Sequence, residues 1–75
     1  MMTSIFDNAK FGTMCETRDG YPAVYIAHII YNDTHKVLVQ GFQAPFIYLS
    51  DGSRKGGGLY ASRYGRNLDI VKLNI

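Results

Sequence analysis

Turn signals at regular intervals constrain this chain more than any other feature. Two Asp-Gly pairs occur, at 19–20 and 51–52, and the segment NDTH lies between them at 32–35. Glycine adopts positive φ without steric cost, and Asn, Asp and Thr side chains bond their own backbone, so these segments favour tight turns. The runs between them are rich in β-branched and aromatic residues, above all PAVYIAHIIYN at 22–32. Short antiparallel strands joined by tight turns are therefore predicted.

Five or six strands are expected, with almost no helix. The segment SIFDNAK, residues 4–10, is expected to form one helical turn that Ser4 caps and Gly12 ends. Pro22 should begin a strand and Pro45 should mark a bend, because proline cannot donate to a sheet ladder. The strands are predicted at 13–17, 22–32, 36–41, 46–50, 58–61 and 68–75.

Alternation divides the long run 22–32 into two faces. The even-numbered side chains, including Val24 and His28, form one face, and the odd-numbered ones, including Tyr25 and Tyr31, form the other. Both faces are apolar enough for a central strand. We expect one face to pack against the core and the other to carry the tyrosines.

A single small barrel is the economical solution for a chain of 75 residues. Closing a meander of short strands removes exposed sheet edges, so an SH3-like barrel over residues 1–75 is predicted. The alternative is an oligonucleotide-binding barrel, which usually needs more residues and a helix. Hydrophobic residues make up 47% of the chain, too many for a disordered polymer.

Cysteine usage and hydropathy indicate the cellular setting. Cys15 is the only cysteine, which excludes an intrachain disulfide and zinc sites built on paired cysteines. No segment has the roughly 18 apolar residues of a membrane span, and the first residues do not resemble a signal peptide. We therefore expect a protein of a reducing cytoplasm without a membrane partner. Whether it is a monomer or a homodimer is left open.

Residues 6–26 resemble a group of small, uncharacterised phage and prophage proteins. Their sequences typically begin with FD..AK.G, then TRDG, then a small residue and a hydrophobic strand. YLSDGS, at 48–53, resembles a later hairpin of the same group, but Tyr21-Pro22 replaces the usual basic residue after TRDG. The matching residues are Phe6, Asp7, Ala9, Lys10, Gly12, Thr17, Arg18, Asp19, Gly20, Ala23 and Val24.

The resemblance implies a function only through the phage origin and small size of the group, and it assigns no catalytic residue. Small accessory phage proteins of this size often bind and block a host protein. The target implied is in the bacterial cytoplasm, for example a defence component such as a CRISPR system. A non-enzymatic protein-binding inhibitor is therefore the first expectation.

The excess positive charge lies in one segment. Residues 51–66 hold four cations and one acid, a net +3, whereas the rest holds four cations and five acids, a net −1. This segment is predicted to be a contact loop, because arginine and tyrosine are common in protein-binding hot spots. Tyr21 and Tyr25 are expected to join it. The binding residues predicted within the loop are Arg54, Lys55, Tyr60, Arg63, Tyr64 and Arg66.

The same residue types fit two other partners. Cations meet phosphates and tyrosine rings stack on bases, so a nucleic acid is one alternative. A small nucleotide messenger is another, because tyrosine can stack on a base while arginine bonds a phosphate. The glycines at 56–58 do not complete a nucleotide-binding loop, since the lysine precedes them. A looser nest of backbone N–H groups could still hold an anion, but the three glycines fit a flexible loop tip or a bulged hairpin better.

Catalytic and metal chemistry have little support in the sequence. Cys15 with His28 or His35 is the only thiol pairing possible, and Cys15 reads better as a small buried hydrophobe. The two histidines with Asp33 are too few ligands, from one strand and its turn, to predict a metal site. No catalytic residue, cofactor or metal is expected. Phe42 and Phe46 are either the end of the core or an apolar patch.

Overall fold

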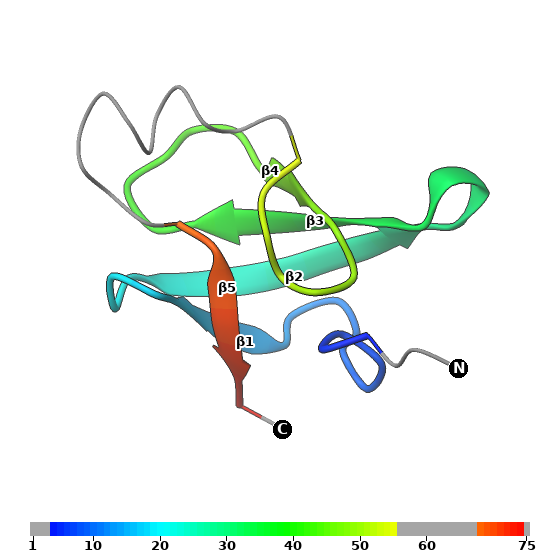
Figure 1. Ribbon diagram of the computed structural model, residues 1–75. Coiled ribbons are helices and arrows are strands. Elements are labelled where there is room, and N and C mark those ends of the chain that lie inside the picture. Colours follow the sequence, from blue (N-terminus) through cyan, green and yellow to red (C-terminus); the bar gives the residue numbers. More distant parts are fainter. Residues whose placement is uncertain (1–3, 56–67, 75) are drawn as a thin grey trace.

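Five antiparallel strands form one curled sheet in the computed structural model (Figure 1). The structure describes residues 4–55 and 68–74. The order across the sheet is β4-β3-β2-β1-β5, so the last strand lies beside the first and the sheet curls into a half barrel. A small all-β, barrel-like fold is thereby confirmed. The elements are β1 (Met14–Thr17), β2 (Pro22–Ile29), the 3-10 turn η1 (Ile30–Asn32), β3 (Thr34–Val39), β4 (Phe46–Tyr48) and β5 (Ile70–Leu73).

The hairpin between β2 and β3 turns earlier than the sequence predicts. Residues 30–32 form η1 instead of extending the strand, and β3 begins at Thr34 instead of Lys36. Asp33 makes the reversal with a left-handed φ of 54°, which aspartate tolerates better than most residues. The predicted turn was therefore placed about two residues too late.

The two ends of the chain follow the predicted pattern only in part. Residues 5–8 form turns, and Ser4 Oγ accepts a hydrogen bond from the Phe6 backbone N–H at 3.0 Å. β4 ends at Tyr48, and β5 covers only the middle of the predicted strand 68–75. The strand predicted at 58–61 lies outside the described residues.

The core lies on the concave face of the sheet. Tyr25 belongs to it with only 3% of its surface exposed, so the expectation that the tyrosine face of β2 points away from the core is wrong for Tyr25. The physical reason is that its hydroxyl has a partner inside, the buried His35. The buried apolar residues are Phe6, Cys15, Ala23, Tyr25, Val37, Val39, Tyr48, Leu68 and Ile70.

A β-bulge in β2 changes which residues face the core. Tyr25 pairs with Val37 and Ala27 pairs with Lys36, so β2 carries one extra residue, Ile26, at this point. One extra residue exchanges inward and outward positions for the rest of the strand. His28 therefore pairs with His35 on the concave face, although simple alternation puts it opposite Tyr25.

Two contacts across the open side of the sheet hold its ends together. The Tyr48 hydroxyl donates to the Leu68 carbonyl at 2.8 Å, and both residues are buried. The Ile70 N–H donates to the Gly52 carbonyl at 2.8 Å and joins the second Asp-Gly turn to β5. In the part of the chain that the structure describes, no helix is long and apolar enough to cross a membrane.

Candidate functional site

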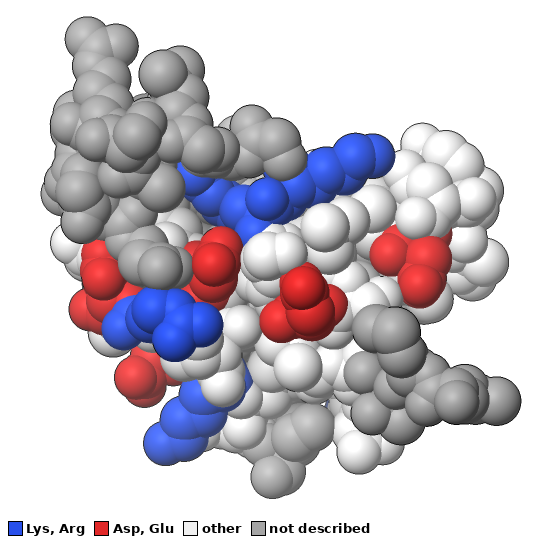
Figure 2. Space-filling view, viewed as in Figure 1, with Lys and Arg blue, Asp and Glu red and all other residues white. Residues whose placement is uncertain are grey.

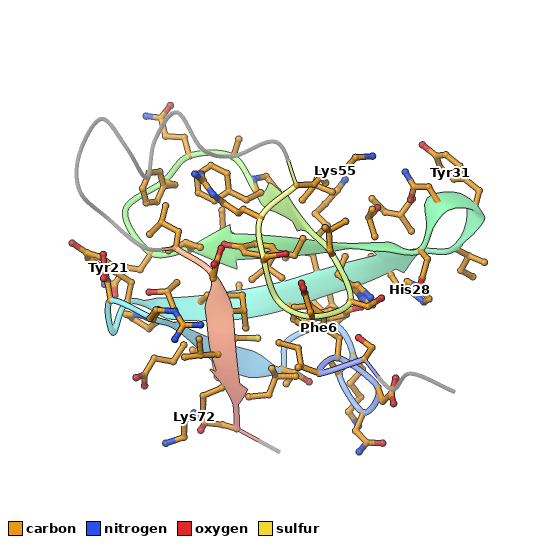
Figure 3. The ribbon with its side chains drawn as sticks, viewed as in Figure 1. Phe6, Tyr21, His28, Tyr31, Lys55 and Lys72 are labelled. Carbon is orange, nitrogen blue, oxygen red and sulfur yellow. The ribbon has the colours of Figure 1, made fainter. Side chains whose placement is uncertain are left out.

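The predicted contact loop is described only at its beginning. Lys55 is exposed and points outward from the sheet (Figure 3). The Arg54 guanidinium lies 4.8 Å from the centre of the Phe46 ring, and the Arg54 N–H donates to Asp69 Oδ1 at 3.1 Å. Arg54 therefore packs on the fold as well as contributing charge. The other predicted loop residues, Tyr60, Arg63, Tyr64 and Arg66, lie outside the described residues.

Charge is balanced over the described part of the chain. Residues 4–55 and 68–74 contain six cations and six acids. Figure 2 shows a band of basic atoms across the upper part of the face in view and acidic groups over the rest of it. Extended contact with phosphates needs an excess of cations, and the described residues by themselves supply no net positive charge for it.

The two tyrosines expected to join the loop lie in different environments. Tyr21 is half-buried and packs against the edge of the core. Tyr25 is buried, with its hydroxyl 2.6 Å from His35 Nδ1. Its ring cannot therefore contribute to an exposed contact surface, and the prediction that it does is corrected here.

An open apolar groove crosses the convex face of the sheet. Met14, Val24 and Leu38 pair with one another across β1, β2 and β3, on the face opposite the core. The groove has a volume of about 460 Å³. Met14 is 45% exposed although it is a large apolar side chain. The lining residues are Met14, Pro22, Ala23, Val24, Leu38, Val39, Gln40, Gly41 and Phe42.

Phe42 and Phe46 combine the two roles expected for them. Both are half-buried against the core, and their rings meet edge to face with centroids 4.9 Å apart. Phe42 also lines the apolar groove, so its side chain reaches the protein surface.

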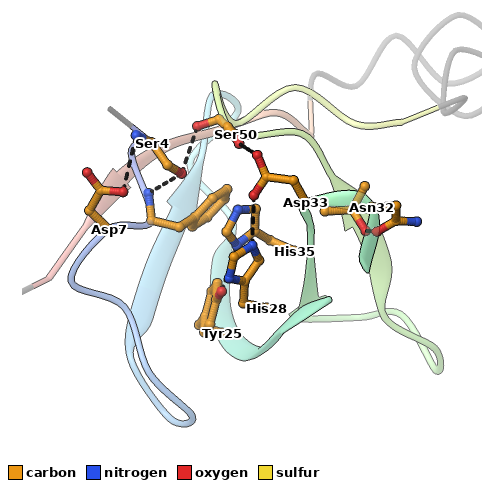
Figure 4. A network of polar contacts seen from close by, with 10 residues as sticks. Ser4, Asp7, Tyr25, His28, Asn32, Asp33, His35 and Ser50 are labelled. Atoms are coloured by element: carbon orange, nitrogen blue, oxygen red, sulfur yellow. Dashed lines mark hydrogen bonds and ion pairs between the residues drawn. The ribbon is translucent and has the colours of Figure 1, made fainter. Parts of the chain in front are cut away.

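A polar cluster lies at the turn of the β2–β3 hairpin, at the end away from the apolar groove (Figure 4). His28 Nε2 is 2.8 Å from Asp33 Oδ1, and the rings of His28 and His35 stack with centroids 4.4 Å apart. Ser50 Oγ donates to Asp33 Oδ2 at 3.2 Å. The cluster borders a cavity of about 310 Å³ that the N-terminal turn also lines. Among the described residues, His28, Asp33 and His35 form the only group of three that could hold a metal ion.

Burial and neighbouring groups shift the pKa values of two residues in this cluster. Burial, and then the nearby His28, lower the pKa of His35, so its imidazole is neutral at physiological pH. Hydrogen bonds from His28 and Ser50 hold the pKa of Asp33 below its usual range, which keeps its carboxylate ionised. A neutral imidazole and a carboxylate are competent ligands.

Cys15 is not arranged as a nucleophile. Its thiol is buried and donates to the Thr13 carbonyl at 3.6 Å. Burial raises the pKa of Cys15 to about 11. The reactive form of cysteine is the thiolate, which such an environment disfavours.

Sequence reasoning considered His28, His35 and Asp33 together but rejected them as too few ligands for a metal site, and it assigned no bulge to β2 that would bring the two imidazoles onto one face. With strict alternation, His28 would lie on the face opposite Tyr25. It could not then meet His35, which bonds the Tyr25 hydroxyl. A bulge leaves little trace in a run whose two faces are both apolar. No protein-family model, curated protein or solved structure matches this chain.

Proposed function

We propose that this protein is a non-enzymatic accessory module that binds a protein of the bacterial host and occludes it. The apolar groove on the convex face is the observation that supports the proposal. An apolar surface left open on a small domain can mark a protein interaction site. The resemblance to small phage proteins points to the same class of function, with an SH3-like barrel as the scaffold.

The groove favours a partner that presents apolar side chains. Its floor is formed by Met14, Val24 and Leu38, and Phe42 adds an aromatic wall at one end. A leucine, methionine or phenylalanine of the partner would exchange water for these side chains. Few hydrogen-bonding groups line the groove, so apolar contact would supply most of the affinity.

The basic loop has a second role in this proposal. Its net +3 charge would attract an acidic surface of the partner and accelerate encounter, while the groove would hold the complex. These contributions respond differently to salt. Added salt should slow association and leave dissociation nearly unchanged.

Site-specific photo-crosslinking in the host tests which surface is used. A photoreactive residue at Leu38 should capture a protein of defined mass in cells. The same residue at Ile30, which is 81% exposed at η1, serves as the matched position at the far end of the hairpin. Equal capture at both positions, or products that nuclease removes, would contradict the proposal. A product of twice the chain mass would instead identify a homodimer.

Variants then test affinity for the captured protein. Met14→Glu should weaken binding by at least about 30-fold if Met14 is a hot spot, since hot spots contribute about 2 kcal/mol or more. Ile30→Glu adds the same charge elsewhere and should bind like the wild type. Simultaneous alanine replacement of Arg54, Lys55, Arg63 and Arg66 should mainly slow association. Stabilisation by a nucleotide alone would favour the messenger alternative.

A further inference from the structure

We propose that His28, Asp33 and His35 form a binding site for a divalent first-row transition-metal ion, independent of the apolar groove. One ring nitrogen of each histidine and one carboxylate oxygen of Asp33 lie within 4.8 Å of one another. Four-coordinate zinc sites hold nitrogen and oxygen ligands about 2.0–2.2 Å from the metal, which puts the ligand atoms about 3.3–3.5 Å apart. The three groups are therefore close enough to share an ion after a local rearrangement, in which the 2.8 Å contact between His28 and Asp33 opens.

A buried nitrogen without a partner is the second observation that points to a ligand. His35 is 3% exposed, and its Nε2 has no hydrogen-bond partner among the described residues. Buried polar atoms are nearly always bonded, and each exception calls for an explanation. A metal ion held by Nε2 would supply the missing interaction.

The surroundings of His35 fit a ligand whose orientation is fixed. Its other nitrogen, Nδ1, is 2.6 Å from the Tyr25 hydroxyl, and the Phe6 ring lies against it with centroids 4.5 Å apart. Metal-binding histidines usually donate their second ring N–H to a carboxylate, a backbone carbonyl or water, and the tyrosine oxygen can accept in the same way, which fixes the tautomer and the ring. If Nδ1 donates to Tyr25, Nε2 carries the lone pair that a metal requires.

Hydrogen bonds also fix the orientation of the Asp33 carboxylate. Its Oδ1 contacts His28 Nε2, and its Oδ2 accepts a hydrogen bond from Ser50. Ser4 Oγ donates in turn to the Ser50 carbonyl at 3.1 Å, so the N-terminal turn is tied to the same cluster (Figure 4). Asp33 therefore already links the β2–β3 hairpin to the turn after β4.

His28 is the ligand that must move. Its ring is parallel to that of His35 within 5°, and two stacked imidazoles cannot both point their lone pairs at one ion. The His28 side chain is 43% exposed, so its ring can turn out of the stack. Coordination would replace the present His28–Asp33 contact, with His35 as the fixed ligand.

The ligand set selects the class of metal. Two imidazoles and one carboxylate suit zinc, nickel, copper or ferrous iron. Magnesium and calcium prefer six or more oxygen ligands, which these residues do not provide. Three protein ligands leave at least one coordination position for water or for a group of another molecule.

Calorimetry and thermal unfolding of the complete, untagged chain test the site, with ZnCl₂ and NiCl₂ as probes and MgCl₂ as the comparison. We expect one zinc or nickel ion per chain and a melting temperature that rises with metal concentration, but no effect of magnesium. His28→Gln and Asp33→Asn alter exposed side chains and should fold normally. Each should weaken metal binding by at least about tenfold, since even residues behind the ligands contribute about 10–100-fold.

Asp51→Asn is the matched control. Asp51 is an exposed aspartate that also accepts a serine hydroxyl, 2.6 Å from Ser53, but it lies outside the cluster. Its replacement should leave metal affinity unchanged. Tyr25→Phe should weaken binding by about 10–100-fold without removing a ligand, because it releases the His35 ring.

Imidazole NMR identifies the nitrogen that binds. The chain has two histidines, both in the cluster, so their ¹⁵N signals can be assigned with the His28→Gln variant. Zinc should shift His35 Nε2 and one nitrogen of His28. Three results would each overturn the proposal: no binding of zinc or nickel, undiminished binding by the His28 and Asp33 variants, or a His35 Nε2 signal that zinc leaves unchanged.

Discussion

Replacing Gly52 by alanine should destabilise this fold much more than the same replacement at Gly20. Both glycines follow an aspartate in a tight turn, and their φ angles are nearly equal, +90° and +89°. An alanine at either position has the strain of a left-handed backbone, about 1–2 kcal/mol. The difference between the two variants therefore isolates what surrounds each turn.

At Gly20 an added Cβ meets no atom within 4 Å, whereas at Gly52 it would lie 2.2 Å from the Ile70 carbonyl oxygen. That oxygen belongs to the backbone of β5, and the Ile70 N–H is bonded to the Gly52 carbonyl. Relieving the clash must disturb this junction, which adds about 1–3 kcal/mol for a buried hydrogen bond left unmade. We therefore expect a total of about 2–5 kcal/mol at Gly52. The whole fold is expected to have only about 4–11 kcal/mol of stability.

Thermal and urea unfolding, both followed by circular dichroism, measure the difference directly. Gly20→Ala should lower the melting temperature by about 4–16 °C, and Gly52→Ala by clearly more. Equal urea midpoints for the two variants would show that the contact between the second turn and β5 does not hold the fold together. A wild-type midpoint for Gly52→Ala would refute the reasoning altogether.

Three further predictions concern buried groups of the scaffold. Tyr48→Phe leaves the Leu68 carbonyl without its donor and should lower the free energy of unfolding by about 1–3 kcal/mol, whereas Tyr31→Phe, at an 89% exposed ring, should have no effect in the same urea titration. Thr17→Val removes the Oγ1 that accepts the Tyr21 N–H at 3.0 Å and should lower the urea midpoint, although the side-chain volume hardly changes. At pH 8 the native Cys15 thiol should react with a disulfide reagent roughly 100-fold more slowly than in urea, because raising its pKa from 9.0 to about 11 reduces the thiolate fraction by that factor. The folded state also retains this proton longer than the unfolded state, so stability should fall as the pH rises from 9 towards 11. Fast alkylation of the native thiol would show that Cys15 is accessible.

The all-β fold and most strand positions follow from local chemistry. Local hydrogen bonds hold the TRDG turn: the Gly20 N–H donates to the Thr17 carbonyl, and the Tyr21 N–H donates to the Thr17 hydroxyl. These contacts span four residues, so a sequence pattern can predict them. The strand order depends instead on β5 returning to β1, a pairing of residues more than fifty positions apart, and local signals do not encode it.

The candidate sites were harder to predict than the fold. The contact loop was predicted from local composition, because basic residues and tyrosines are concentrated in one segment of the sequence. The apolar groove was not, because both faces of the run 22–32 are apolar and composition does not say which face is covered. The buried position of Tyr25 depends on His35, a partner on another strand. Such a pairing becomes visible only when the register is known.

The bulge at Ile26 separates the two candidate sites on one strand. Before it, Val24 points to the convex face and lines the groove; after it, His28 points to the concave face and meets His35. Without the extra residue, His28 would lie on the convex face with Val24, and His35 would have no second imidazole beside it. The two sites therefore lie at opposite ends and on opposite faces of the β2–β3 hairpin. Because of this separation, a change at Met14 should leave metal binding intact, and a change at Asp33 should leave the groove intact.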